Sequence, residues 1–206
     1  MTCTILLVRH AAHDGLGDRL TGRTPGVSLG QIGRDQAQRL SQRIRSVRPA
    51  QIIASPQPRT QETAHALASA CGLPAVQTDG RLDEIDFGDT WTNRTWDELD
   101  QDPAWRTWNE QRATARTPGG ETMAAVQARI VASVEAARHE GKAGDTIVMV
   151  THADLIKAAV CHVLNLPIGQ LHRFDVDPAS TTGLAWGDWG AKLLWLNERI
   201  DTHPSA

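Results

Sequence analysis

Short, continuous apolar runs alternate with longer amphipathic stretches along most of the chain. Runs at 4–10, 51–55 and 145–152 are typical of strands that are buried on both faces. Between and after these runs, apolar residues recur at spacings of three and four positions, which is typical of helices with one buried face. This alternation predicts an α/β fold: a three-layer sandwich with a mostly parallel central sheet and helices on both faces. Weaker strand candidates lie at 173–176, 181–186 and 192–196.

Turn and cap residues divide the chain further. Ser55 followed by Pro56 predicts a helix N-cap with proline in the first helical position, and Gly72 predicts the end of that helix. The stretch from Trp91 to Arg112 favours short helices. We therefore expect one domain over residues 1–206, with about 89–120 inserted as a helical lid. Four tryptophans in that stretch are expected to form the core of the lid: 91, 96, 105 and 108.

Composition narrows the setting in which the protein works. There are 21 Lys and Arg against 24 Asp and Glu, so bulk charge indicates neither a nucleic-acid partner nor a membrane surface. The three cysteines are far apart and form no CxxC motif, which favours free thiols in a reducing compartment. No apolar run approaches the roughly 20 residues that span a bilayer. We expect a cytoplasmic protein.

Basic residues follow the strand candidates at one kind of position. Arg9 and His10 end the first strand, Arg59 lies in the first turn after the second, and His152 ends the run at 145–152. Ligands of open α/β sheets bind beyond the carboxyl ends of the strands, so these four side chains are expected to share one pocket. Two helix N-termini would add partial positive charge there. Such a pocket suits a dianionic phosphoryl group.

The same residues suggest a reaction. A neutral imidazole can attack phosphorus and form a phosphohistidine, while arginine forks hold the phosphoryl oxygens. The leaving oxygen then needs a proton, and the carboxyl candidates are Asp83, Glu84 and Asp86. Since arginine and histidine supply the countercharge, no metal and no other cofactor is expected. His13 could line the pocket or cap a loop, and the sequence does not separate these two roles.

Five segments, in order, resemble motifs of the histidine phosphatase superfamily, the phosphoglycerate-mutase-like proteins. They are LLVRHA (6–11), SPQPRTQETA (55–64), RLDEIDFG (81–88), PGGET (118–122) and VTHADLI (150–156). The resemblance covers about 4–196 and implies the α/β fold of that family. It also implies a small phosphorylated metabolite as the substrate.

The resemblance implies roles residue by residue. His10 would accept the phosphoryl group, which Arg9, Arg59 and His152 would clamp, and Glu84 would be the proton donor. Three further positions would contact the substrate: Gly22, Arg23 and Ala153. Two alanines depart from the family pattern, because Ala11 and Ala153 stand where glycine is usual.

The chain has no tyrosine, and it lacks the Tyr, Lys and paired Arg with which the mutases hold phosphoglycerate. We therefore expect a metal-independent phosphatase that acts on small phosphate monoesters through a phosphohistidine on His10. A cofactor-dependent phosphoglycerate mutase is the alternative, and a non-catalytic phosphate-binding module is a third. Dimers are common among similar proteins, so a homodimer is a candidate assembly.

Overall fold

A central six-stranded sheet organises the molecule in a computed structural model that describes residues 1–200. The strand order is β3-β2-β4-β1-β5-β6. The first four of these strands run parallel, and β5 and β6 are antiparallel to their neighbours. The strands are β1 (Thr2–Arg9), β2 (Gln51–Ala54), β3 (Gln77–Thr78), β4 (Thr146–Thr151), β5 (Thr181–Gly187) and β6 (Gly190–Glu198). The predicted α/β class with a mostly parallel sheet is confirmed.

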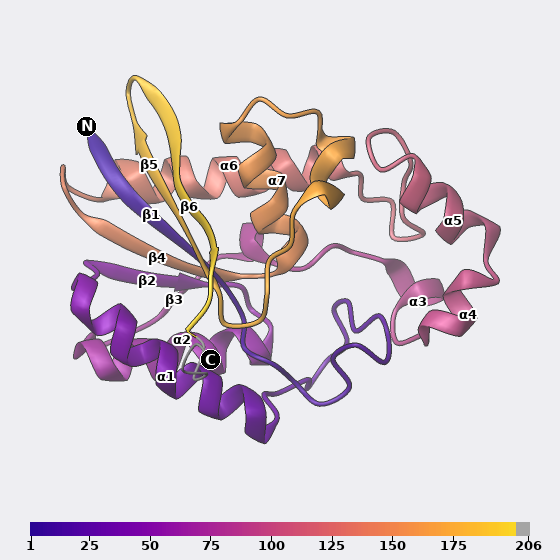
Figure 1. Cartoon of the computed structure of the whole chain (residues 1–206), viewed down its shortest axis with the longest axis horizontal. Coiled ribbons are helices and arrows are strands. Elements are labelled where there is room, and N and C mark those ends of the chain that lie inside the picture. Colours follow the sequence, from indigo (N-terminus) through magenta and orange to yellow (C-terminus); the bar gives the residue numbers. More distant parts are fainter. Residues whose placement is uncertain (201–206) are drawn as a thin grey trace, which may run out of the picture.

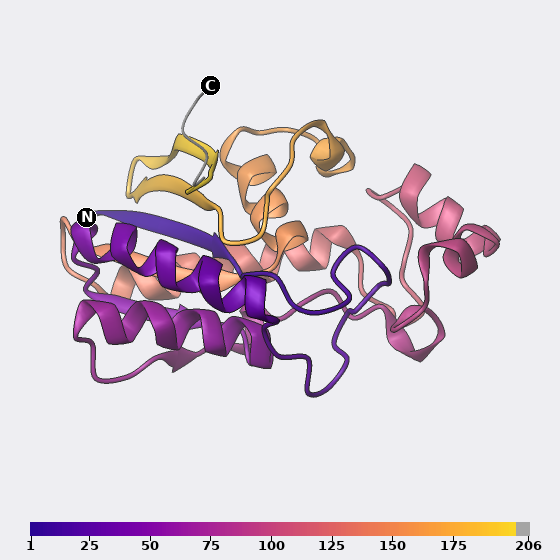
Figure 2. The same ribbon diagram turned by 60° about the horizontal axis from the view of Figure 1, so that its bottom comes forward.

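Helices cover both faces of this sheet. In Figures 1 and 2, α1 and α2 lie together on one side of the strands, and α6 and α7 lie on the other. The α-helices are α1 (Gln31–Val47), α2 (Pro58–Cys71), α3 (Gly88–Trp91), α4 (Trp96–Asp100), α5 (Pro103–Glu110), α6 (Met123–Glu140) and α7 (Ala153–Val163). The 3-10 turns are η1 (Gly80–Leu82) and η2 (Ile168–Arg173). None of the helices within 1–200 is both long enough and apolar enough to cross a membrane.

The strand period explains the two cores. Successive side chains of a strand point to opposite faces, so β1 places Leu6 and Val8 in one core and Ile5 and Leu7 in the other. The first core is closed by α1 and α2, and the second by α6 and α7. Both faces of β1 are therefore buried, which is why it appears in the sequence as a continuous apolar run rather than an alternating one.

The predicted start of α2 is wrong by two residues. Its N-cap is Gln57 and its proline at the first position is Pro58, because the Ser55 side chain is turned into the protein instead of capping the helix. The predicted end is confirmed: Gly72 has φ +69° and donates its N–H to the carbonyl groups of Ala68 and Ser69. A residue with a side chain rarely adopts this left-handed conformation.

The strand expected at 173–176 is absent: η2 ends at Arg173, and no strand follows until β5 within residues 1–200. The half-buried side chain of Phe174 packs against the core from a segment without a paired neighbour. Conversely, β3 was not expected, because both of its residues are exposed and form no apolar pattern. The candidates at 181–186 and 192–196 are confirmed as β5 and β6.

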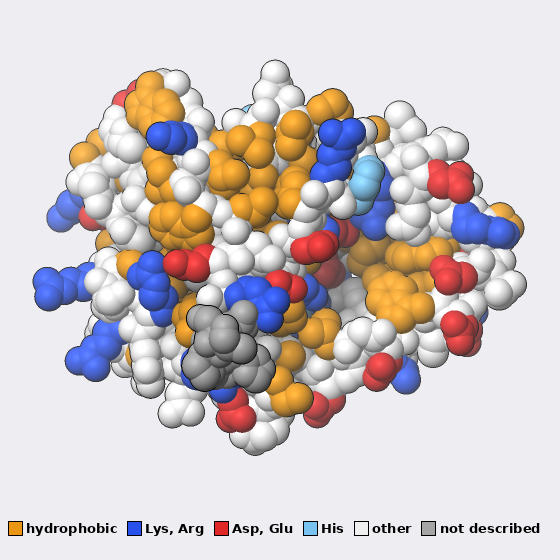
Figure 3. All heavy atoms as spheres, in the orientation of Figure 1, with side chains coloured by type: hydrophobic (Ala, Val, Ile, Leu, Met, Phe, Trp, Pro, Cys, Tyr) orange, Lys and Arg blue, Asp and Glu red, His pale blue; other side chains and the backbone are white. Residues whose placement is uncertain are grey.

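The segment that carries α3, α4 and α5 lies at one end of the molecule, beyond the end of the sheet (Figure 1). Trp91, Trp105 and Trp108 are buried there, and Trp91 contacts both of the others, as expected of a lid core, whereas Trp96 is 38% exposed. In Figure 3 one group of apolar side chains lies over α7 and a second lies over α3. That this segment acts as a lid stays a prediction.

Candidate active site

Three strand ends bring the candidate residues together. In the parallel pairing, Arg9 of β1 is opposite Thr151 of β4, and Ala54 of β2 is opposite Val150. The residues that follow these strands therefore emerge side by side at one edge of the sheet. They are His10, Ser55 and His152. The rings of His10 and His152 have centroids 5.2 Å apart, so the predicted meeting of the two imidazoles is found.

His10 is oriented as a nucleophile. Its Nδ1 lies 2.9 Å from the carbonyl oxygen of Ala11, which can only accept, so Nδ1 carries the proton and Nε2 keeps a lone pair. The side chain is buried, and burial together with the charges of Arg59 and Arg9 holds its pKa well below 6.5. At neutral pH this imidazole is therefore uncharged, as attack on phosphorus requires.

Arg59 joins the two histidines. Its Nε donates to His10 Nε2 at 3.4 Å, and its Nη2 lies 3.3 Å from His152 Nδ1 and 2.8 Å from the carbonyl oxygen of Gly22. The residue is only 1% exposed, although its guanidinium stays charged in a protein. Pro58 starts α2 and holds Arg59 in the first turn of that helix.

Two guanidinium nitrogens in this pocket lack a hydrogen-bond partner in the part of the chain that the structure describes. Nη1 of Arg59 and Nε of Arg9 are buried without a hydrogen bond to any group within residues 1–200. Arg9 is fixed by a bond of 2.7 Å from its Nη1 to the carbonyl oxygen of Val176. A buried donor without an acceptor is costly, so both atoms indicate an anion that belongs between these side chains.

Glu84 faces the pocket from the loop after η1. Its Oε2 lies 3.5 Å from His152 Nδ1, and its Oε1 accepts from the N–H of Ile85 at 2.9 Å. Burial raises the pKa of this carboxyl to about 7, against the lowering effect of Arg59. A carboxyl that holds a proton near neutral pH can act as a general acid and, once ionised, as a base.

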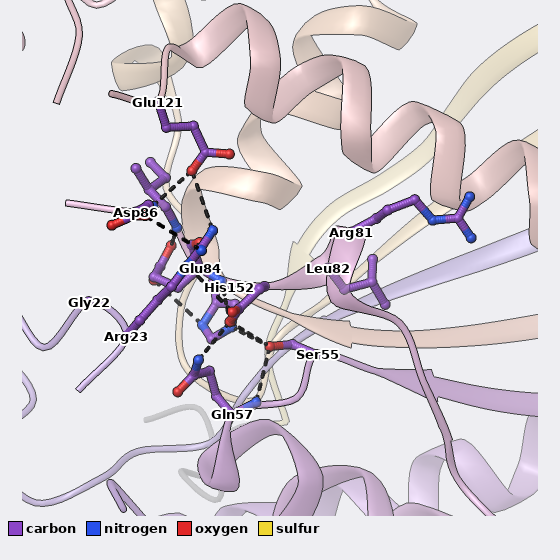
Figure 4. Close-up of polar contacts among 12 residues, drawn as sticks. Gly22, Arg23, Ser55, Gln57, Arg81, Leu82, Glu84, Asp86, Glu121 and His152 are labelled. Carbon is purple, nitrogen blue, oxygen red and sulfur yellow. Dashed lines mark hydrogen bonds and ion pairs between the residues drawn. The ribbon is translucent and has the colours of Figure 1, made fainter. Parts of the chain in front are cut away.

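Asp83, the neighbouring candidate, has a different environment. Its Oδ1 accepts from Gln57 Nε2 and from the N–H of Glu84, both at 2.8 Å, and lies 3.3 Å from Ser55 Oγ. These three groups engage the side chain of Asp83, and Figure 4 shows two of the residues that supply them, Ser55 and Gln57, below His152. Asp86 is also occupied, since its Oδ1 accepts from the N–H of Gly88. Of the three carboxyls, Glu84 is the one that approaches an imidazole of the pair.

Arg23 lies against carboxylates. Its guanidinium is 3.4 Å from Asp83, 3.9 Å from Asp86 and 3.5 Å from Glu121, and its Nε donates to the carbonyl oxygen of Glu84. Figure 4 shows Arg23 beside this acidic group. Its charge is therefore compensated within the protein. The predicted contact of Arg23 with substrate stays a prediction. The same holds for Gly22, whose carbonyl oxygen accepts a hydrogen bond from Arg59.

Arg129 of α6 holds the same loop from the other side. It donates to the carbonyl oxygens of Arg81 at 2.8 Å, Asp83 at 2.5 Å and Glu84 at 3.1 Å, and it is paired with Glu121 at 2.7 Å. This contact was not expected from the sequence. An arginine on the polar side of a helix gives no sign of the distant carbonyl groups that it binds.

The remaining candidates border the pocket. His13 is buried with its ring centroid 5.7 Å from that of His10, and its Nδ1 lies 2.9 Å from the carbonyl oxygen of Asp14. Ala153 is the first residue of α7, where free backbone N–H groups favour an anion. Beside it, Asp154 forms an ion pair of 3.1 Å with Arg112 from the segment after α5.

Together these features define a class of site. Two buried arginines with nitrogens that lack a partner within residues 1–200, a neutral imidazole with an unprotonated Nε2 and a carboxyl with a raised pKa surround one space. Arginine forks suit a phosphoryl group, and the other two groups supply a nucleophile and an acid. The geometry is that of a phosphoryl-transfer site.

Comparison with known proteins agrees with the assignment of a phosphoryl-transfer site. A family model for the histidine phosphatase superfamily (branch 1) matches residues 5–199. The chain therefore belongs to the histidine phosphatase superfamily, as its motifs predicted.

Individual relatives carry different names. Phosphoserine phosphatase 1 of Hydrogenobacter thermophilus is 30% identical over 198 residues, which cover 94% of this chain and 91% of that protein. A probable phosphoglycerate mutase, GpmB of Yersinia pestis, is 34% identical over 167 residues, covering 79% of this chain and 75% of that protein. Among solved structures, a mycobacterial glucosyl-3-phosphoglycerate phosphatase aligns with a TM-score of 0.82 at 29% identity, over 96% of this chain and all of that one. Bacillus stearothermophilus YhfR aligns with a TM-score of 0.87 at 26% identity, over 95% and 97% of the two chains.

Proposed function

We propose that this protein hydrolyses small phosphate monoesters through a phosphohistidine on His10. The observation that carries the proposal is the pairing of a neutral His10, with its Nε2 lone pair free of a proton, and a Glu84 carboxyl that holds a proton near pH 7. A buried nucleophile and a buried acid on either side of an anion pocket are what two-step phosphoryl transfer needs.

In the first step, Nε2 of His10 attacks phosphorus and the bond from phosphorus to the ester oxygen breaks. Glu84 gives its proton to the leaving oxygen, so an alcohol departs instead of an alkoxide. Arg9 and Arg59 hold the phosphoryl oxygens through the two nitrogens that have no partner among residues 1–200. Because these guanidinium groups supply the positive charge, the proposed reaction is metal-independent.

In the second step, the Glu84 carboxylate removes a proton from water as the water oxygen attacks phosphorus. The bond from phosphorus to Nε2 breaks, inorganic phosphate forms, and His10 returns to its neutral state with Glu84 protonated again. A pKa of about 7 suits a group that must both give and take a proton in one cycle.

The substrate belongs to the small phosphorylated metabolites, in keeping with the names of the phosphatase relatives. A phosphoglycerate mutase is the second candidate, favoured by the GpmB relatives. Three of the four arginines in the 89–120 segment weaken it, since Arg112 is paired with Asp154, and Arg94 and Arg116 donate to carbonyl groups of their own segment. A cytoplasmic location and a homodimer complete the proposal.

Release of inorganic phosphate from p-nitrophenyl phosphate in the presence of EDTA tests the proposal. His10→Ala should abolish turnover together with the acid-labile phosphoryl label on the protein. His65→Ala is a matched control, since His65 is an exposed histidine of α2. Turnover that persists in His10→Ala would refute the assignment. Interconversion of phosphoglycerates that requires a bisphosphate primer, without net hydrolysis, would favour the mutase.

A further inference from the structure

Ser55 is placed between a carboxylate and an imidazole in the interior. Its Oγ lies 2.9 Å from His152 Nε2 and 3.3 Å from Asp83 Oδ1, and it receives the N–H of Gln57 at 3.4 Å. Both Ser55 and His152 are 0% exposed. Water therefore has no access to these contacts, and the groups must satisfy one another.

The protons of these contacts can be assigned by counting donors. A serine hydroxyl has one proton and two lone pairs. Asp83 Oδ1 collects N–H groups from Gln57 and Glu84, so it is an acceptor. The hydroxyl proton of Ser55 therefore points to Asp83, and its lone pairs accept from the N–H of Gln57 and from Nε2–H of His152. This assignment satisfies every group in the chain of contacts.

A second contact leads to the same tautomer from the other side of the ring. Nη2 of Arg59 lies 3.3 Å from His152 Nδ1, and a guanidinium can only donate. Nδ1 must therefore carry a lone pair, which leaves the single proton of the neutral ring on Nε2. Burial and the charge of Arg59 hold the pKa of His152 well below 6.5, so the ring has one proton at neutral pH.

We infer that Ser55 and Asp83 are positioning residues that fix His152 in its Nε2–H tautomer. The Nδ1 lone pair of His152 then accepts from Arg59, so the ring offers no N–H to Glu84 Oε2, which lies 3.5 Å from Nδ1. The opposite tautomer would direct an N–H of His152 at the N–H of Arg59 and would favour an ionised Glu84. Ser55 and Asp83 thus help to keep Glu84, the proton donor of the proposed hydrolysis, in its protonated form. In this respect the inference rests on the proposed function.

Nitrogen-15 NMR of the histidine-labelled, phosphate-free protein tests the tautomer directly. The measurement needs no activity, so its result is independent of whether the protein proves to be a phosphatase. We expect a protonated Nε2 and an unprotonated Nδ1 for His152 at neutral pH, assigned by the resonances that disappear in His152→Asn. A protonated Nδ1, or a ring that carries both protons, would overturn the inference without any further variant.

Ser55→Ala leaves Nε2–H of His152 without its acceptor, so only the Arg59 contact still favours this tautomer and a mixture with the Nδ1–H form should be observed. Ser133→Ala is the matched control, because Ser133 is also buried and donates to the carboxylate of Asp79 at 2.6 Å, on α6 away from the pocket. It should leave the His152 resonances unchanged. An unchanged tautomer in a folded Ser55→Ala protein would reject the role of Ser55.

Kinetics give a second measure of the same role. If the protein is a phosphatase, Ser55→Ala should lower kcat/KM for alkyl phosphates about tenfold more than for p-nitrophenyl phosphate, because only the former depend strongly on the acid. Equal losses on both substrates would contradict the role, since general damage to the fold reduces all substrates alike. Absence of turnover in the wild-type protein would count against the proposed function and would leave the NMR result as the test of the tautomer.

Discussion

Glu84→Gln should stabilise the protein above neutral pH. Burial raises the pKa of the Glu84 carboxyl from 4.5 to about 7, so between these values the folded state keeps a proton that the unfolded chain releases. Stability that this proton contributes is present below the unfolded pKa and is lost as the pH rises through the folded pKa. Glutamine has nearly the shape of the protonated carboxyl and cannot ionise, so the variant escapes this loss.

The magnitude follows from the two pKa values. A pKa that rises from 4.5 to about 7 corresponds to about 3 kcal/mol between full protonation and full ionisation. The side chain is only 17% exposed, so solvent screening reduces this figure little. Between about pH 5 and about pH 8.5, the free energy of unfolding of Glu84→Gln should gain roughly 2–3 kcal/mol relative to wild type.

Buried histidines contribute with the opposite sign. The pKa values of His10 and His152 lie below 6.5, chiefly because of burial, so the stability linked to them is lost as the pH falls below 6.5. This loss is common to wild type and Glu84→Gln. It should therefore largely cancel when the two unfolding free energies are subtracted at each pH.

Urea unfolding in phosphate-free buffers across this pH range measures the difference. Glu98→Gln is the matched control, because bonds from the backbone N–H and hydroxyl of Thr95 lower the pKa of Glu98. Its effect should be constant above about pH 5, where that carboxylate is ionised in both states. A Glu84→Gln difference that changes by less than about 0.5 kcal/mol would refute the buried, protonated carboxyl.

Three other predictions concern positioning and packing. Arg129→Gln should slow hydrolysis of alkyl phosphates about tenfold more than that of p-nitrophenyl phosphate, because the loop that carries Glu84 loses its contacts to α6. Arg138→Gln, on the same helix, should show no such selectivity. Equal losses on both substrates in Arg129→Gln would contradict this prediction. In urea unfolding, Trp91→Phe should lower the free energy of unfolding by about 1 kcal/mol more than Trp108→Phe. The reason is that the indole N–H of Trp91 donates to the carboxylate of Asp102, whereas that of Trp108 has no partner within residues 1–200. Equal losses of stability would contradict this prediction. Gly33→Ala should lower the free energy of unfolding by more than about 2 kcal/mol, since a Cβ would lie 1.8 Å from the carbonyl oxygen of Ala12 in the loop after β1. An unchanged Tm would contradict this close approach.

The meeting of His10 and His152 could be predicted because it depends on strand order alone. Both strands are continuous apolar runs, and parallel neighbours bring their carboxyl ends to one edge. The start of α2 could not be predicted in the same way. Ser55 and Pro56 form a plausible helix start, yet the hydroxyl is taken by His152 and Asp83, which are distant in sequence. A side chain that could cap a helix was used instead to orient a ring.

The roles of the arginines show the same limit more clearly. Arg9 and Arg59 could be placed because they lie at or just after strand ends, whereas for Arg23, in the glycine-rich loop TGRTPG, the family resemblance implies a substrate contact as well. The difference is electrostatic and three-dimensional. Arg23 is within 4 Å of three carboxylates, from Asp83, Asp86 and Glu121. Sequence patterns indicate that a cation is present, and only the fold decides whether its charge is compensated.

This division of charge gives the pocket its selectivity for an anion. A carboxylate close to the unpartnered nitrogens of Arg9 and Arg59 would satisfy them and compete with a phosphoryl group. Glu84, the carboxyl with the largest charge effect on both arginines, holds its proton until the pH approaches 7, and Asp154 is paired with Arg112. Two buried charges thus stay uncompensated at a cost in folding free energy, which binding of a dianion recovers. The same protonation that keeps Glu84 from neutralising the arginines is what allows it to protonate a leaving group, so affinity for phosphate and acid catalysis depend on one buried proton.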